Sequence, residues 1–282
     1  MTTSMSSRAL PIAVLVLSLV FFWAWVWFAV AGGGGLTDPA DILTQGAQAT
    51  ADADSVRLSL TVEGSLTDAD TGEPVSLDGM TVAGDLDLAG EAAHLTFSLP
   101  MLMGMSGEVI VIGQDMYLLT PMVDEWLHLT GEPDDAAEPG DEPPTDEEIA
   151  AKVDELLATE GVSIAKLADQ PCGDDTCYHL QVSVSAEAIA AHQGDRPDMD
   201  VFGSGELGGL MPNPEFTGPV VIDLLFQTDG LWLRQVAVSS DGDAGEATMT
   251  LELSDYDTTF DISPPPADQV IEADDFPFFE LT

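Results

Sequence analysis

Apolar and polar residues alternate along most of the chain after residue 55. The alternation is strictest over Val56–Glu63, with the sequence VRLSLTVE, where every second residue is apolar. A period of two predicts a strand with one buried face. The same pattern predicts further strands over Met80–Leu88, Ala93–Leu99, Glu108–Ile112, Met116–Thr120, Trp126–Leu129, Cys177–Val184, Pro219–Gln227, Leu231–Val238, Ala247–Leu253 and Tyr256–Ile262.

Helical spacing of apolar residues is confined to a few short segments. It predicts helices over Pro39–Asp54, Ile149–Leu157, Val162–Leu167 and Ala186–His192. About ten strands joined by short turns, with so few helices, predict an α+β fold. We expect a strongly curved antiparallel β-sheet, a half-barrel, with a few helices over its concave face.

An uncharged apolar run, Ala9–Ala31, precedes this pattern. Such a run rises about 35 Å as a helix, enough to cross a hydrocarbon core of roughly 30 Å. It predicts a transmembrane anchor, with residues 1–8 as a cytoplasmic tail and 32–38 as a glycine-rich tether. The alternative is a signal peptide cleaved after Ala31. Either interpretation places the main domain outside the cytoplasm, on the cell membrane or secreted.

Two segments break the pattern of strands: the first is expected to be a solvated acidic loop and the second an irregular insertion. Residues 131–148 hold nine acidic residues and four prolines, and residues 193–217 are rich in glycine and proline. Both lie inside one predicted domain, residues 39–270, which a C-terminal tail, residues 271–282, follows.

The charge is strongly unbalanced. The chain has 51 acidic and 6 basic residues, a formal net charge of −45. This excludes nucleic acid as a partner, because phosphates need Lys and Arg. A solvated acidic surface that keeps an exported protein soluble explains the charge. A cation-binding surface, or one that binds an envelope protein partner, is the alternative.

The two cysteines, Cys172 and Cys177, flank a Gly-Asp-Asp turn. Two close cysteines in an exported protein predict a local disulfide. The closed loop is short, so the bond would staple one turn.

Motifs for catalysis and metal binding are nearly absent. The four histidines lie in separate elements, and no GxSxG elbow occurs. Residues 203–208 match GxGxxG, but prolines follow where that motif requires a helix. The acidic turns at 68–73 and 241–243 fit hairpin turns better than calcium loops. We expect no catalytic residue, no metal and no cofactor.

Methionines gather where a strand connection should be polar. Met101 and Met103 lie there, and Trp126 follows nearby. Adaptable methionine surfaces suit apolar ligands, so these residues could form the mouth of a cavity. Alternatively, the methionines fill the core beneath a loop.

Four segments in this order resemble a known family: ADILTQGAQATADADSVRLSLTVEGSL, YHLQVSVSAEAIAA, VIDLLFQTDGLWLRQVAVSS and LSDYDTTFDISPPP. Over about Asp38–Val270 the chain resembles the LppX/LprAFG family of cell-envelope lipoproteins, whose fold is similar to the LolA and LolB carriers. The resemblance implies a half-barrel with an apolar cavity that carries a lipid or lipoglycan. The cavity residues it implies are Leu58, Leu60, Val62, Leu95, Phe97, Val109, Val111 and Leu118.

The chain departs from this family at the lipid attachment site. Val30-Ala31-Gly32 resembles the box that precedes the lipidated cysteine, but Gly33 occupies the cysteine position. The hypothesis from the sequence is therefore a membrane-tethered, extracytoplasmic lipid-binding domain without catalytic activity. A structural or sensory ectodomain that binds a protein partner through its acidic surface is the alternative.

Overall fold

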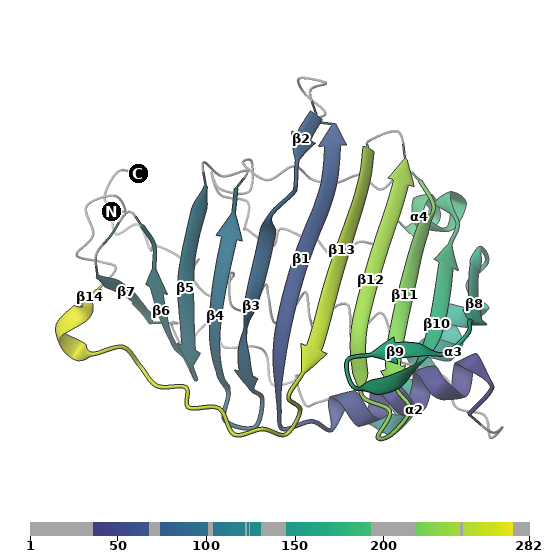
Figure 1. The fold of residues 1–282 in the computed structure, drawn as a ribbon, viewed down its shortest axis with the longest axis horizontal. Coiled ribbons are helices and arrows are strands. Elements are labelled where there is room, and N and C mark those ends of the chain that lie inside the picture. The colour runs from purple at the N-terminus through teal and green to yellow at the C-terminus, as the bar shows by residue number, and fades with distance from the viewer. Residues whose placement is uncertain are drawn as a thin grey trace, which may run out of the picture.

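One large sheet organises the molecule (Figure 1). The computed structural model describes residues 36–67, 74–100, 104–121, 123, 125–130, 145–192, 218–242 and 245–272. Fourteen strands occur in these ranges: β1 (Ser55–Thr67), β2 (Pro74–Ser76), β3 (Met80–Asp87), β4 (Ala92–Leu99), β5 (Met105–Ile112), β6 (Asp115–Leu119), β7 (Trp126–Thr130), β8 (Val162–Lys166), β9 (Gln170–Cys172), β10 (Asp175–Val184), β11 (Val220–Gln227), β12 (Leu233–Gly242), β13 (Gly245–Ser254) and β14 (Val270–Glu272). Among them run three α-helices, α2 (Pro39–Ala51), α3 (Asp146–Ala158) and α4 (Ala186–His192), and a 3-10 turn, η4 (Ala267–Gln269).

The sheet consists of two antiparallel meanders joined at one seam. The strand order is β14-β7-β6-β5-β4-β3-β1-β13-β12-β11-β10-β8, and β2 and β9 pair with β1 and β10. The seam is the long pairing of β1 with β13, which runs from Arg57–Ser254 to Leu66–Gly245. At the far edge β14 pairs in parallel with β7, after the chain has crossed beneath the strand ends (Figure 1).

Helices α2 and α3 pack on one face of the sheet, over β8, β10 and β12. We call this the inner face. Asp38 caps α2 by accepting a hydrogen bond from the Ala40 amide, and Pro39 begins the helix. Ile42 and Leu43 of α2 and Val153 of α3 are fully buried in the same core as Leu180 and Phe226 of the sheet.

The predicted curved, mostly β fold with few helices is confirmed, but two segments differ. Val162–Leu167 is not a helix: Val162–Lys166 forms the strand β8, because Val162 and Ile164 alternate with polar Ser163 and pair with β10. Tyr256–Ile262 is not a strand, because Asp255 and Asp257 adopt positive φ angles of 51° and 54° and turn the chain.

Two predicted boundaries shift as well. The acidic loop, expected to run to Glu148, ends at Thr145, because Thr145 and Glu148 form a capping box that starts α3. Ile271 and Glu272, which were expected to belong to the C-terminal tail, form part of β14 instead. The predicted loop at 193–217 lies outside the described residues, as do residues 131–144.

Candidate functional site

A continuous apolar row crosses the inner face. The strand register places Leu58 beside Gly84, Gly84 beside Leu95, Leu95 beside Val109, and Val109 beside Leu118. A second row joins Leu60 to Val82 and Val82 to Phe97. Because side chains alternate along each strand, these rows share one face.

Burial divides this face into two parts. Leu58, Leu95 and Val109 are at most 2% exposed, and they belong to the closed core. Apolar side chains in the rows on either side of this one, and Leu118 at its end, pack against this core but stay partly exposed. We call these residues the inner patch: Leu60, Val82, Phe97, Val111, Leu118 and Met249.

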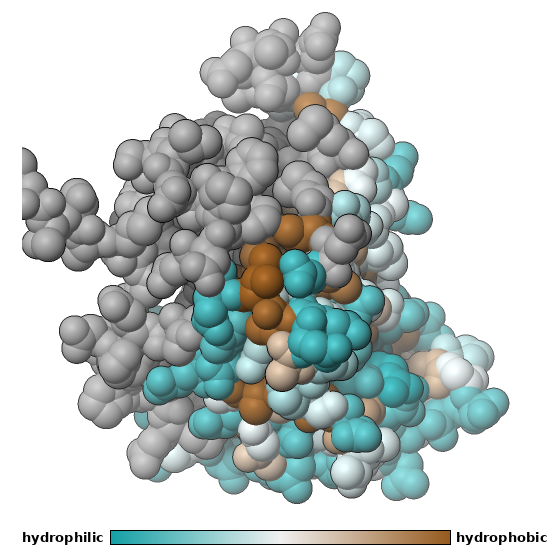
Figure 2. All heavy atoms as spheres, turned by 90° about the vertical axis from the view of Figure 1, so that its left-hand side faces the viewer, coloured by the Kyte–Doolittle hydropathy of each residue, from teal (hydrophilic) through white to brown (hydrophobic). Residues whose placement is uncertain are grey.

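Hydrophobic residues also reach the surface at the edge of the sheet. Seen from the side of β14 and β7, they form a narrow stripe between hydrophilic residues (Figure 2).

The structure brings together most of the predicted cavity residues. All eight that the family resemblance implies lie on the inner face, Val62 at its half-buried end. Trp126 lies on the opposite face, because its neighbour Leu127 pairs with Leu118 and points inward. Met101 and Met103 lie outside the described residues.

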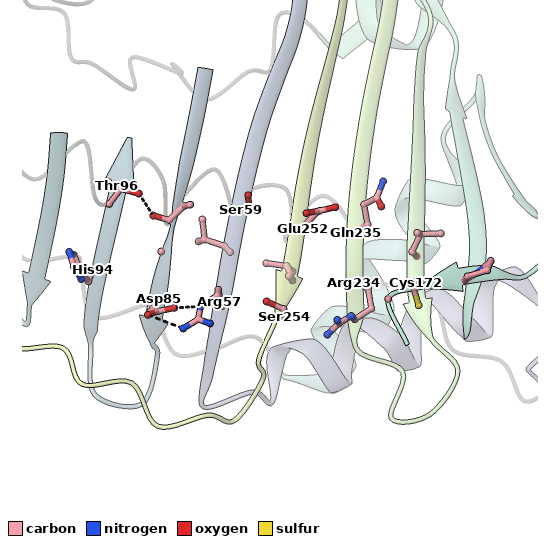
Figure 3. A pocket seen from close by; sticks show the side chains of 17 residues that line it. Arg57, Ser59, Asp85, His94, Thr96, Cys172, Arg234, Gln235, Glu252 and Ser254 are labelled. Carbon is pink, nitrogen blue, oxygen red and sulfur yellow. Dashed lines mark hydrogen bonds and ion pairs between the residues drawn. The ribbon is translucent and has the colours of Figure 1, made fainter. Parts of the chain in front are cut away.

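The opposite face, which we call the outer face, carries an open groove of about 720 Å³. Outward side chains of β4, β3, β1, β13 and β12 form its floor, and Pro171–Gly173 of the β9 hairpin forms a wall (Figure 3). The Cys172–Cys177 disulfide, predicted from the sequence, closes this hairpin with a Cα–Cα distance of 5.8 Å. The disulfide therefore helps to fix the shape of the groove wall.

Contacts between basic or histidine side chains and carboxylates run along the outer face. Arg57 Nε contacts Asp85 Oδ1 at 2.6 Å, and Arg57 Nη1 contacts Asp255 Oδ2 at 2.7 Å. His94 Nε2 lies 3.3 Å from Glu108, and His179 Nε2 lies 2.7 Å from Asp223. Within the described ranges, no three metal-ligating side chains come together.

Sequence reasoning did not find the groove. Alternation alone predicts that the outer face is polar, and it carries no signal that a distant hairpin stands over that face. The cysteines at the hairpin were the available clue, since a stapled turn is rigid enough to form a wall.

Solved structures with a similar fold include two mycobacterial lipoproteins. LppX from Mycobacterium tuberculosis is 13% identical over 80% of this chain and all of that chain, with a TM-score of 0.44. LprF from Mycobacterium bovis is 16% identical over 80% of this chain and 96% of that chain, with a TM-score of 0.46. A MucA/MucB complex from Pseudomonas aeruginosa matches at 10% identity and a TM-score of 0.30, over 82% of this chain and 60% of that one.

The solved structures that the chain matches thus include LppX and LprF, in line with the resemblance to the LppX/LprAFG family noted from the sequence. No family model matches the chain, and a comparison with curated proteins finds no significant match. The function of this chain is therefore argued from its own residues.

The predicted membrane anchor, residues 9–31, lies outside the described residues. Among the helices that are described, none is long and apolar enough to span a bilayer.

Proposed function

We propose that the chain is a non-catalytic binding protein of the cell envelope that holds or transfers a lipid or lipoglycan on its inner face. The observation that carries this proposal is the inner patch, six apolar side chains from β1, β3, β4, β5, β6 and β13 that stay partly exposed beside a closed core. Acyl chains laid on such a surface would gain about 0.8 kcal/mol for each buried CH₂ group. The domain would lie outside the cytoplasm, tethered by residues 9–31 or released from them.

The acidic surface fits this role. A net charge of −45 keeps the outside of the domain away from anionic headgroups, so contact with a membrane would depend on apolar surface. Ligand exchange would then be confined to the region around the inner patch.

The test is the lipid content of the purified full-length chain, measured by organic extraction and mass spectrometry. Val82 lies at the centre of the inner patch, paired with Leu60 and Phe97, and its neighbour Thr81 points to the outer face. Val82→Asp places a charge among the acyl chains and is expected to lower the bound lipid at least tenfold. Thr81→Asp, the matched control with the same change of charge, is expected to keep the wild-type amount.

Circular dichroism would verify that both variants fold, and Met249→Asp offers a second site on the far side of β1. Equal lipid content in all variants would overturn the inner patch as the binding surface. A wild-type chain that carries no lipid, even after incubation with envelope lipids, would favour the alternative, an ectodomain that binds a protein partner.

A further inference from the structure

Two rows of polar side chains cross the floor of the outer groove. In the upper row the register places Gln235 beside Glu252 and Glu252 beside Ser59, and the row of polar side chains stops at Ala83. In the lower row Ser254 lies beside Arg57, and Arg57 beside Asp85. Neighbours in a row are about 4.8 Å apart, the spacing of paired strands, so a small ligand would span several of them.

At one end of this floor the polar side chains already bind one another or the backbone. Arg57 bridges Asp85 and Asp255, and the Thr96 hydroxyl donates to the Ala83 carbonyl oxygen at 3.1 Å. The other end differs. Within the described residues, no hydrogen bond or ion pair engages the side chains there, which are Ser59, Arg234, Gln235, Glu252 and Ser254 (Figure 3).

Arg234 is unusual for a chain with so many acids. Three of the four basic side chains that the structure describes contact a carboxylate: Arg57 with Asp85, Lys152 with Glu155, and Lys166 with Asp169. Arg234 is the fourth, and it makes no ion pair in these ranges. Its guanidinium is therefore available to a ligand.

A β-bulge places this arginine in the groove. The register of β11 and β12 shifts between Leu225–Gln235 and Phe226–Leu233, so Arg234 is the extra residue. Bulges re-aim side chains and are common beside binding sites. As a result, the consecutive residues Arg234 and Gln235 both line the groove.

We propose that this end of the outer groove binds a hydroxylated ligand with one oxyanion, such as a sugar that carries a carboxylate or a phosphate. A guanidinium binds carboxylate and phosphate oxygens through paired hydrogen bonds. The Gln235 amide and the hydroxyls of Ser59 and Ser254 suit the hydroxyl groups of a sugar, and the Glu252 carboxylate accepts hydrogen bonds from them. Glu252 also repels a second negative charge. The site lies on the face opposite the inner patch, so it is independent of the proposed lipid function.

The volume of the groove is compatible with this class of ligand. About 720 Å³ lies within the usual range for small-molecule sites, roughly 300–1,000 Å³. The stapled β9 hairpin gives the groove a fixed wall at Cys172.

The experiment is a ligand-observed NMR titration of the full-length chain with glucuronate, glucose 6-phosphate and glucose at constant ionic strength. At least one charged sugar is expected to bind saturably, and glucose more weakly. Arg234→Gln is expected to weaken binding of the charged sugar at least tenfold, since it removes a charge-assisted hydrogen bond. Lys166→Gln, which removes an equal charge outside the groove, is expected to bind like the wild type.

The comparison of the two charged sugars identifies the oxyanion, carboxylate or phosphate. Absence of saturable binding by either one, or equal binding by Arg234→Gln and the wild type, would overturn the proposal. Inorganic phosphate that competes as well as glucose 6-phosphate would also overturn it, because the hydroxyl contacts would then contribute nothing. Glu252→Gln provides a second readout: it should weaken sugar binding and strengthen binding of inorganic phosphate.

Discussion

His128 joins three elements through its two ring nitrogens. Nε2 lies 2.9 Å from Asp115 Oδ1 of β6, and Nδ1 lies 3.0 Å from Glu272 Oε2 of β14. The ring also stacks on Tyr117, with centroids 4.8 Å apart. Burial of the ring opposes protonation, but the hydrogen bonds and charges of Asp115 and Glu272 outweigh it, so the pKa of His128 is raised. When the ring is protonated, its two N–H groups donate to these carboxylates and hold β14 against the sheet.

Replacing His128 is expected to change how stability depends on pH. Because the pKa is raised in the folded state, the stabilisation is fully present below the unfolded pKa of about 6.5. It is lost as the pH rises through the folded pKa. In urea unfolding, His128→Gln should cost about 1 kcal/mol more at pH 5.5 than at pH 8.5. His94→Gln, at a longer and more exposed pair, is the control, and a pH-independent cost for His128→Gln would contradict this role.

At the level of elements, α2 approaches the sheet at a glycine. A Cβ atom on Gly46 would lie 2.3 Å from Cδ1 of Phe226, a fully buried residue of β11. The Thr50 hydroxyl, one turn further on, accepts a hydrogen bond from the Leu233 amide at 3.0 Å. The backbone of α2 at Gly46 therefore packs directly against the side chain of Phe226 in β11, and Thr50 binds the backbone of β12.

Gly46→Ala is expected to destabilise the protein even though alanine is the better helix former. Overpacking against Phe226 costs about 1–3 kcal/mol, and the gain in helix propensity is about 1 kcal/mol. Thermal unfolding followed by circular dichroism should show a lower Tm. Gln45→Ala, at the exposed neighbouring position, should leave the Tm nearly unchanged. A higher Tm for Gly46→Ala would show that the helix is not seated this closely.

Elements with strict alternation were predictable, because one buried face imposes a period of two. Val56–Glu63 lies within β1, and Ala93–Leu99 within β4. The short strands β2, β9 and β14 were not, since three residues carry no period and depend on a partner strand. The apolar inner face was predictable for the same reason as the strands. The outer groove was not, because it depends on the bulge at Arg234 and on the distant β9 hairpin.

For the whole molecule, charge is the dominant property. A net charge of −45 on 282 residues makes the folded chain repel itself. Raising KCl shortens the screening length from about 10 Å at 0.1 M to about 3 Å at 1 M. This repulsion should then fall.

The protein is accordingly expected to be more stable in salt. Between 0.1 and 1 M KCl, the Tm should rise by several degrees, and a constant or falling Tm would contradict the expectation. CaCl₂ or MgCl₂ at equal ionic strength separates two explanations of the acidic surface. An equal rise indicates screening alone, and a larger rise indicates bound divalent cations.

The two meanders exchange their terminal elements. Helix α2 precedes the first meander but packs on strands of the second, and β14 follows the second meander but pairs with β7 of the first. Each meander is thus packed against an element from the other end of the chain, in addition to the pairing of β1 with β13. Partial opening of either half would release a piece from both, so the layout favours a single cooperative unfolding transition over stepwise loss of one half. A long open sheet thereby gains the all-or-none behaviour of a smaller domain.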